Sequence, residues 1–551
     1  MKFDSATIKQ ILLKGNYVND DDIKNGEAFA EKHGSTIVEY LLSEGLITRD
    51  LLGQAIAEAF AMPYANININ TPTREQVMLI PQAVAAKYRV VFFADKKSVI
   101  YITTDNPTQP GIMEALTAIF PKKKIVLCYS PSEDIDAILV QYRKSLATRF
   151  SQIIAAQKRV APEIIEQIIL DAITYHASDI HFEPQGNDVL VRFRIDGVLA
   201  EAGRIPKEYY ENILNRIKIQ SNLRIDEHFS AQDGSMHYNN VEMAVDLRTS
   251  VVPTVDGEKV VLRVLAAYIQ DLTLGEIGLS QANQEVFEIS AAKPFGMILV
   301  TGPTGSGKTT SLYALLKILN NQNVNITTIE DPVEYKMSGV NQIQVNTQTN
   351  LTFAKGLRSI VRQDPDIILV GEIRDEETAE IAVNAALTGH LLLSTFHAND
   401  AATAIPRLLD MKVEPFLLSS TLELLVAQRL VRKICTHCRH SVTKPIAELP
   451  LDEYWAKNAF GKKEAVLYQG AGCPMCENSG FRGRTAIFEI IRNTPEMQEL
   501  ILKSPSALEV WSLARKQGTT SLFEDGLEKV KNGVTTLEEL LRVAQPPATK
   551  F

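Results

Sequence analysis

The eight residues from Gly302 to Thr309, GPTGSGKT, constrain the fold of this chain more than any other stretch. They match the phosphate-loop pattern G-x-x-x-x-G-K-[ST], which follows a strand and opens a helix. The apolar run MILV at 297–300 precedes the match, and the leucine-rich segment 311–319 follows it. Because both flanking elements are present, the pattern predicts an α/β domain built around a nucleoside triphosphate site.

Each residue type in the loop has a physical reason to be there. Glycines let the backbone curl so that successive N–H groups point inward, and the positive end of the following helix dipole adds to the attraction for phosphate. Lys308 is expected to reach the β- and γ-phosphates of ATP, and the Thr309 hydroxyl to bind Mg²⁺. The alternative is a glycine-rich turn without a ligand. The residues expected to bind nucleotide are Gly302, Pro303, Thr304, Gly305, Ser306, Gly307, Lys308, Thr309 and Thr310.

Length and charge bound the remaining possibilities. A chain of 551 residues is long enough for three to four domains, each with its own core. The net charge of -9 argues against an open basic surface for nucleic acid. No run approaches the roughly 18 apolar residues of a membrane span, and the start of the chain lacks the apolar core of a signal peptide. We expect a cytoplasmic protein that reaches a membrane through a partner.

Patterning divides the chain into three parts. Residues 1–146 have helical apolar spacing and then strand-like runs, which predicts a small α+β packing or docking module. After a polar helical connector at about 141–159, the part 147–271 shows alternation such as VRFRI at 191–195, with apolar and basic residues on opposite faces of a strand. The nucleotide-binding part follows at 272–551.

Carboxylates follow a strand of the nucleotide-binding part. The β-branched run at 326–329 leads into Glu330, Asp331 and Glu334. Acids gathered at a strand end repel one another unless a cation or a water-activating role holds them there. A simple charged loop is the alternative that the residues alone leave open.

A second strand, DIILVGE at 366–372, ends in Glu372 as a Walker B strand does. At the position where a Walker B strand usually has an aspartate, this chain has Gly371. The expectation that this strand binds the metal directly is therefore weaker. Glu372 is left as the acting carboxylate, and its action can include a bridging water. The next apolar run is bracketed by His390 and His397. These histidines either line a nucleotide site or are hydrogen-bonded residues at strand ends.

Four of the five cysteines form two Cys-x-x-Cys pairs, at Cys435, Cys438, Cys473 and Cys476. Four thiolates can converge tetrahedrally on Zn²⁺ and leave no coordination position open for chemistry. The pattern predicts a structural zinc site in an insertion at about 430–480, with a redox dithiol as the alternative. Cys128 stands alone in an apolar run and reads as a buried small hydrophobe.

Taken together, these motifs resemble a known family. The segments 302–309, 328–335, 364–375 and 388–397 look like the Walker A, Asp box, Walker B and His box of secretion ATPases, in order within 178–489. The four-cysteine insertion and the amino-terminal module are similar to those of the type IV pilus assembly and type II secretion branch. The resemblance implies a hexameric ring in which a PAS-like domain (147–271) and a RecA-like ATPase domain (272–551) bind nucleotide between them.

The resemblance also implies roles by position. Glu334 in the Asp box would polarise the attacking water, and Glu372 would support the metal and γ-phosphate side. His390 and His397 would sense the nucleotide state.

Two arginines of the second domain gain a role in the same way. On residue type alone, Arg248 and Arg263, near strand ends, are predicted to be surface charges. In the family, arginines at the matching positions are brought onto the phosphates, where they neutralise charge that develops during transfer. ATP-dependent closure of this domain on the core would then be the power stroke, acting on a membrane platform protein.

The expected function is therefore a hexameric cytoplasmic ATPase motor, peripheral at the inner membrane, that powers type IV pilus assembly. Type II secretion, driven by assembly of a pilus-like pseudopilus, is the first alternative. A DNA translocase is the second, and the acidic net charge and the lack of a basic, aromatic-interleaved segment count against it. A nucleotide-gated scaffold without turnover would need a missing catalytic carboxylate, but Glu334 is present.

One departure from the family yields a prediction. Many relatives bind cyclic di-GMP through an R-L-G start, a glycine and a closing Gln in the first domain. Aligned on Gly45, this chain has TIV at 36–38 in place of R-L-G, and Ala59 in place of the Gln. We predict that calorimetric titration of the full chain with cyclic di-GMP gives no binding signal. A clear isotherm would contradict this prediction.

Overall fold

The computed structural model describes residues 5–547 apart from 34–35, 68, 97, 140–141, 143–159, 241–242, 266–271, 347, 462 and 477. It divides into two compact units. The first comprises 1–144 with 435–439 and 470–480, and the second comprises the rest of the chain. The expected boundaries at 146/147 and 271/272, and the connector at 141–159 apart from Tyr142, lie outside the described residues.

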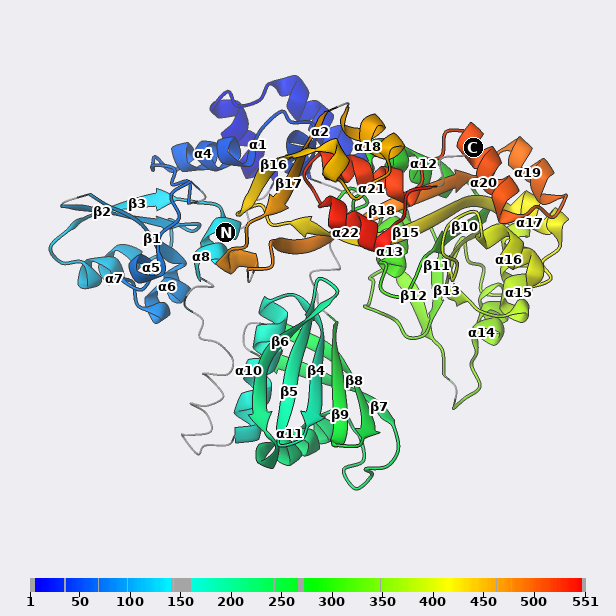
Figure 1. Ribbon diagram of the computed structural model, residues 1–551, viewed down its shortest axis with the longest axis horizontal. Helices are drawn as coiled ribbons and strands as arrows, with labels where there is room; N and C mark the ends of the chain where they lie inside the picture. The colour runs from blue at the N-terminus through cyan, green and yellow to red at the C-terminus, as the bar shows by residue number, and fades with distance from the viewer. Residues whose placement is uncertain are drawn as a thin grey trace. The chain divides into compact units, whose positions relative to one another are not determined.

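The first unit begins with helices and continues as a small α+β fold (Figure 1). Strands β1 and β2 pair antiparallel, and β2 and β3 pair parallel. One apolar core lies among the first four helices, and a second lies between the sheet and its helices. The elements are α1 (Ser5–Lys14), α2 (Asp20–His33), α3 (Ile37–Ser43), α4 (Arg49–Ala59), α5 (Arg74–Val77), α6 (Gln82–Tyr88), β1 (Val90–Lys96), β2 (Val99–Thr104), α7 (Ile112–Ile119), β3 (Lys124–Tyr129) and α8 (Ser132–Leu139).

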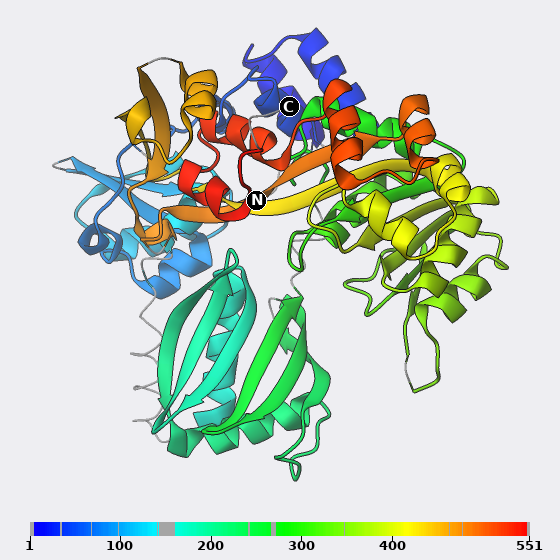
Figure 2. The same ribbon diagram turned by 45° about the vertical axis from the view of Figure 1, so that its right-hand side comes forward.

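The second unit contains a six-stranded antiparallel sheet, in the order β6-β5-β4-β9-β8-β7, on which α10 and α11 pack (Figure 2). The predicted alternation is present, since Val191 and Phe193 are buried in its core. Arg192 on the other face pairs with Glu183 at 2.7 Å. The elements are α10 (Val160–Thr174), β4 (Ala177–Gln185), β5 (Asp188–Ile195), β6 (Val198–Pro206), α11 (Lys207–Gln220), β7 (Gln232–Asn240), β8 (Met243–Thr254) and β9 (Gly257–Leu265).

The nucleotide-binding part is built on a seven-stranded sheet in the order β12-β11-β13-β14-β10-β15-β18. The first six strands are parallel, and β18 runs antiparallel to β15. The apolar run at 297–300 lies in β10, which is buried along its whole length. The elements up to β15 are α12 (Gln281–Ala291), β10 (Gly296–Thr301), α13 (Lys308–Leu319), β11 (Ile326–Glu330), β12 (Val340–Gln344), α14 (Phe353–Ile360), β13 (Ile367–Ile373), α15 (Glu376–Leu387), β14 (Leu391–Phe396), α16 (Ala404–Asp410), α17 (Pro415–Thr421) and β15 (Leu422–Ile434).

Two apolar cores, one on each face of this sheet, complete a layered α/β domain, and the predicted α/β fold class is confirmed. One core includes α12 and α13, and the other includes α14, α15 and the carboxyl-terminal helices. The remaining elements are β16 (Arg439–Pro445), η3 (Ile446–Glu448), α18 (Glu453–Phe460), β17 (Glu464–Gly470), η4 (Pro474–Cys476), β18 (Phe481–Arg492), α19 (Pro495–Ile501), α20 (Ala507–Lys516), α21 (Leu522–Lys531) and α22 (Leu537–Val543).

Within the described part of the chain, every helix is too short or too polar to cross a membrane.

A buried charge cluster fastens the last helix to the sheet. Glu539 of α22 is 2% exposed and accepts hydrogen bonds from Arg432 of β15 at 2.8 Å and from Arg542 at 2.7 Å. Burial alone would raise the pKa of Glu539, but the hydrogen bonds from Arg542 and Arg432 lower it from 4.5 to about 2. The cluster therefore stabilises the folded state while Glu539 is ionised.

The contribution of this charge cluster to the stability of the fold should depend on pH. Because the folded-state pKa is depressed, the stabilisation is present above about pH 4.5 and is lost as the pH falls toward 2, with a size of about 3 kcal/mol. We expect Glu539→Gln to lower the free energy of unfolding at pH 7 by about 2–3 kcal/mol. The difference from wild type should shrink below pH 4. The control Glu538→Gln, at a side chain 63% exposed, should change little. Equal losses in both variants would contradict the role of the buried cluster.

Candidate nucleotide site and metal centre

The phosphate loop joins the end of β10 to the start of α13. Its glycines Gly302, Gly305 and Gly307 have φ values of 148°, 77° and 85°, which side chains rarely adopt. A Cβ atom on Gly302 would lie 2.4 Å from the Gln428 carbonyl oxygen and 2.7 Å from Ser306 Oγ. The loop therefore needs glycine for both its backbone angles and its close packing against β15.

Two polar groups of this loop are buried. Lys308 is 9% exposed, and its Nζ donates to the carbonyl oxygens of Gly302 at 3.0 Å and Pro303 at 3.1 Å. Burial lowers the pKa of Lys308, and the charge of Glu372 opposes that shift. Ser306 Oγ is buried and finds no hydrogen-bond partner among the described residues. A buried ammonium and a spare hydroxyl at a helix start fit a phosphate ligand.

The remaining loop residues are more open. Pro303, Thr304 and Gly305 are exposed, while Thr309 and Thr310 are half-buried at the first turn of α13. The Thr309 hydroxyl follows Lys308 directly, as the magnesium-binding position of the pattern requires.

The structure brings Arg248 and Glu334 together. Glu334 lies in the segment 331–339 between β11 and β12, and its side chain is 41% exposed. Arg248 of β8 donates from Nη2 to the Val333 carbonyl oxygen at 2.8 Å, and its Nη1 lies 3.4 Å from Glu334 Oε2. The Asp box therefore receives an arginine from the six-stranded sheet.

Arg263 is placed differently. It is the strand neighbour of Arg248, but its Nε contacts Asp179 Oδ1 at 3.2 Å within the same sheet. Its side chain is 58% exposed. The structure therefore holds Arg263 on Asp179 rather than on the Asp box.

Glu372 lies where the Walker B strand ends. Its carboxylate contacts Arg374 at 2.5 Å and His397 Nε2 at 3.1 Å. The neighbouring Gly371 has a packing reason, because a Cβ there would lie 3.2 Å from the Glu330 Cα and 3.3 Å from the Ile329 carbonyl oxygen. A side chain in place of Gly371 would push β13 away from β11.

His390 and His397 flank β14 at opposite ends. His397 follows the strand and contacts Glu372, whereas His390 precedes it, and its Nδ1 lies 2.8 Å from the Ala385 carbonyl oxygen. Strand β14 runs parallel to β10, with Leu391 beside Gly296, so His390 lies at the edge of the sheet opposite the phosphate loop. Direct contact of His390 with phosphates in the loop of its own chain is therefore excluded, and its predicted sensing role stays a prediction.

Sequence reasoning missed several residues of this region. Arg374 could have been noticed as a charge beside Glu372. No sequence pattern indicated the buried contacts of Tyr313 and Gln342 with Glu330, because a tyrosine in a leucine-rich helix is expected to be an ordinary core residue.

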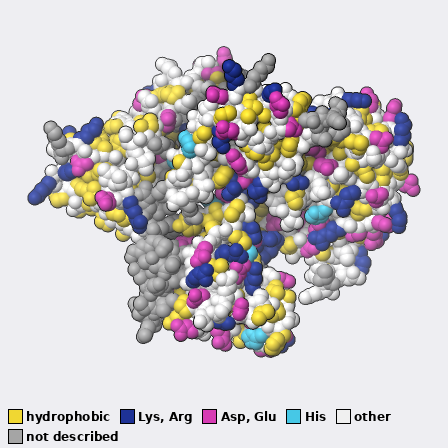
Figure 3. All heavy atoms as spheres, in the orientation of Figure 1, with side chains coloured by type: hydrophobic (Ala, Val, Ile, Leu, Met, Phe, Trp, Pro, Cys, Tyr) yellow, Lys and Arg dark blue, Asp and Glu magenta, His cyan; other side chains and the backbone are white. Residues whose placement is uncertain are grey.

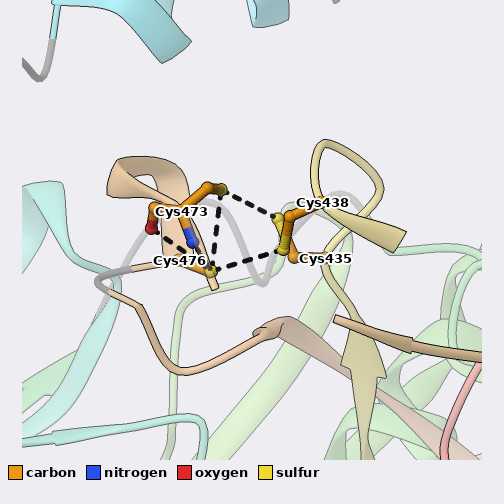
Figure 4. Close-up of side chains that lie close together, drawn as sticks. All are labelled: Cys435, Cys438, Cys473 and Cys476. Carbon is orange, nitrogen blue, oxygen red and sulfur yellow. Dashed lines mark hydrogen bonds between the residues drawn. The ribbon is translucent and has the colours of Figure 1, made fainter. Parts of the chain in front are cut away.

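The four cysteines of the two pairs converge, as Figure 4 shows. Their sulfur atoms all lie within 4.8 Å of one another, and the Cys435–Cys473 and Cys438–Cys476 separations are both 3.8 Å. Ligands about 2.3 Å from a tetrahedral zinc ion are separated by about 3.8 Å, whereas a disulfide would bring two sulfurs to about 2 Å. The cluster therefore fits a four-thiolate metal site.

Backbone approach completes this centre. Gly480 N lies 3.3 Å from Cys476 Sγ, and Cys435 N donates to the Gly480 carbonyl oxygen at 2.9 Å. A Cβ on Gly470 would lie 2.1 Å from the same carbonyl oxygen, so the two cysteine loops approach closely only with glycine there. The isolated Cys128 is 1% exposed, and burial raises its pKa to about 11, as expected of a buried small residue.

Comparison with known proteins gives the family. Residues 155–542 match the type II/IV secretion system protein family, and residues 60–149 match the MshEN domain. The chain is similar to the type IV pilus assembly ATPase PilB of Acinetobacter baylyi, with 35% identity covering 98% of this chain and 96% of that protein. It is 38% identical to PilB of Thermus thermophilus over 92% of this chain, but spans only 59% of that protein's length.

Other relatives match a shorter part. Type II secretion system protein E of Pseudomonas aeruginosa is 46% identical over 69% of this chain and 75% of its own length. Among solved structures, the Legionella pneumophila ATPase DotB superposes with a TM-score of 0.52 at 21% identity, covering 70% of this chain and 96% of DotB, which shows a shared fold. The chain thus belongs to the type II/IV secretion system protein family and is an ATP hydrolase of the group that contains the pilus assembly and type II secretion ATPases.

Proposed function

We propose that this chain is the ATPase motor that powers type IV pilus assembly at the inner membrane, working as a hexamer in the cytoplasm. The observation that carries the proposal is the length of the match, because PilB of Acinetobacter baylyi aligns with 98% of the chain, including the amino-terminal module. Type II secretion is the second candidate. It is favoured by the higher identity of 46% to a type II secretion system protein E, but that match covers 69% of the chain.

The proposed hydrolytic site uses ATP as substrate. Lys308 and the backbone N–H groups of the loop hold the phosphates. Glu334 accepts a proton from the attacking water, whose oxygen bonds to the γ-phosphorus as the bond to the β–γ bridging oxygen breaks. ADP and phosphate leave. The Arg248 contact with the Val333 carbonyl oxygen supports this assignment, because it puts a guanidinium beside the same loop.

Magnesium and the remaining residues complete the proposal. Mg²⁺, held by Thr309 and the phosphates, would neutralise phosphate charge when bound. Glu372 would orient this side of the site through its contacts with Arg374 and His397. Arg263 would leave Asp179 for the phosphates as the second domain (147–271) closes on the ATPase domain (272–551). Closure would then act on a membrane platform protein, with the amino-terminal domain (1–146) as a docking module.

We further propose that Cys435, Cys438, Cys473 and Cys476 bind zinc. Four thiolates select Zn²⁺ over harder ions, and the sulfur separations of 3.7–3.8 Å fit its tetrahedral geometry. The ion would hold the two cysteine loops together and has no open position for catalysis.

A DNA translocase is disfavoured by charge. On the face that Figure 3 shows, basic and acidic side chains are interspersed over most of the surface, and the net charge is -9. Nucleic-acid tracks instead gather lysines and arginines on one face.

The first test is phosphate release from ATP. Glu334→Gln removes the proposed base but keeps the side-chain shape, so we expect turnover to fall about 10²- to 10⁴-fold while nucleotide binding persists. Lys308→Ala should lose nucleotide binding as well. Duplex DNA should leave the wild-type rate unchanged. Turnover by Glu334→Gln at the wild-type rate would remove Glu334 as the base, and strong stimulation by DNA would favour the translocase.

The zinc proposal has its own test. Elemental analysis of the purified chain should give one zinc per chain, and Cys435→Ser should bind less metal and unfold at a lower temperature. The control Cys128→Ser changes a cysteine outside the cluster and should retain the metal. Absence of bound metal from both the wild-type and the Cys435→Ser protein, together with unchanged stability of Cys435→Ser, would contradict the site.

A further inference from the structure

A buried hydrogen-bond network lies between the phosphate-loop helix and the Asp box. Tyr313 of α13 is fully buried, and its hydroxyl donates to Glu330 Oε2. Glu330, the last residue of β11, is 3% exposed, and its Oε1 accepts from the Thr328 hydroxyl at 2.6 Å. Gln342 Nε2 of β12 lies 3.3 Å from the Tyr313 hydroxyl and 3.5 Å from Glu330 Oε1.

The network suits an ionised Glu330. Both of its carboxylate oxygens face donors, and an ionised carboxylate is acceptor-only. Burial raises the pKa of Glu330, and hydrogen bonds from Thr328, Tyr313 and Gln342 oppose that shift. Losing one donor would leave a charged or polar oxygen buried without a partner, which is unfavourable.

The same side chains hold the segment 331–339, which has no helix or strand of its own. Gln342 Nε2 donates to the Tyr335 carbonyl oxygen at 3.1 Å, and Gln342 Oε1 accepts from Met337 N at 2.8 Å. The Tyr335 ring packs edge-on against Tyr313, with ring centres 4.7 Å apart. Burial raises the pKa of the Tyr313 hydroxyl, and the charge and hydrogen bond of Glu330 raise it further.

Tyr313 connects the helix that follows the phosphate loop to the segment that contains Glu334. It follows Lys308 by five residues in one continuous helix, so its hydroxyl is rigidly connected to the phosphate loop. On its other side it contacts Glu330 and Tyr335, the residues one before and one after the span 331–334 that ends at Glu334. Two other polar residues of this helix, Lys308 and Ser311, form hydrogen bonds with the phosphate loop and with Gln428 of β15.

We infer that Tyr313, with Gln342 and Glu330, is a positioning residue that sets the place of Glu334 relative to the phosphate loop. The inference rests on the proposed role of Glu334 as the base. Because Tyr313 is fully buried, its inferred action is through the loop. A displaced base slows proton transfer without weakening phosphate binding, because Lys308 and the loop glycines stay in place.

The experiment compares single-atom deletions in the full-length chain. Tyr313→Phe removes the hydroxyl but keeps the ring against Tyr335. Tyr210→Phe is the matched control, since the Tyr210 hydroxyl is also buried and donates to a carbonyl oxygen, that of Glu258 at 2.7 Å, in the second domain. For each variant we would measure the dissociation constant of ATP, the number of nucleotide sites and the turnover rate per site.

We expect Tyr313→Phe to lower turnover per site about tenfold and to leave the ATP dissociation constant within about twofold. Tyr210→Phe should match wild type in both quantities. Gln342→Ala should change turnover in the same direction, and it serves as the test if Tyr313→Phe does not fold. Wild-type turnover by Tyr313→Phe, or a parallel loss of binding and turnover, would overturn the inference.

Two variants measured together distinguish failure of the positioning role from failure of the proposed function. Glu334→Gln measured alongside reports on the base itself. If Glu334→Gln loses turnover while Tyr313→Phe keeps it, only the positioning role fails. If Glu334→Gln keeps turnover, the assignment of the base fails, whatever Tyr313→Phe does.

Discussion

The parallel direction of β11, β13, β14 and β10 is the constraint on which the site depends. Parallel strands end at one edge of a sheet, so whatever follows each strand gathers there. The phosphate loop follows β10, Glu334 of the Asp box follows β11, Glu372 lies at the end of β13 and His397 follows β14. The site is thus assembled by topology from segments that are far apart in the sequence, and His390, which precedes β14, falls at the other edge.

An acidic side chain of the six-stranded sheet partly balances the charge of its arginines. Arg248 and Arg263 are direct neighbours on β8 and β9, and like charges in that position repel. Asp179, 8% exposed, lies next to Arg263 and 3.6 Å from Arg194, so it offsets part of that repulsion. In the proposed mechanism, phosphate replaces Asp179 as the partner of Arg263.

Sequence patterns were sufficient to predict those parts of the site whose residues stand at fixed spacings along the chain. The phosphate loop and the Cys-x-x-Cys pairs are local patterns, and both lie in the fold as predicted. Contacts between distant residues could not be predicted in this way. Arg248 meets Val333 across 85 positions and was singled out only by family resemblance. The Tyr313–Glu330 contact joins a core-like helix to a charged strand end and leaves no pattern at all. Gly371 was recognised as a departure, but its packing reason needs the distance between β11 and β13.

In the proposed mechanism, ATP turnover needs Arg248 of the six-stranded sheet beside Glu334. The most direct measurement is the rate of phosphate release by Arg248→Ala at saturating ATP, with Arg204→Ala as control, because Arg204 is an exposed arginine of the same sheet paired with Glu201. We expect a loss of about 10³-fold or more for Arg248→Ala and none for Arg204→Ala. Turnover by Arg248→Ala at the wild-type rate would show that the site works without this arginine and would rule out the proposed mechanism.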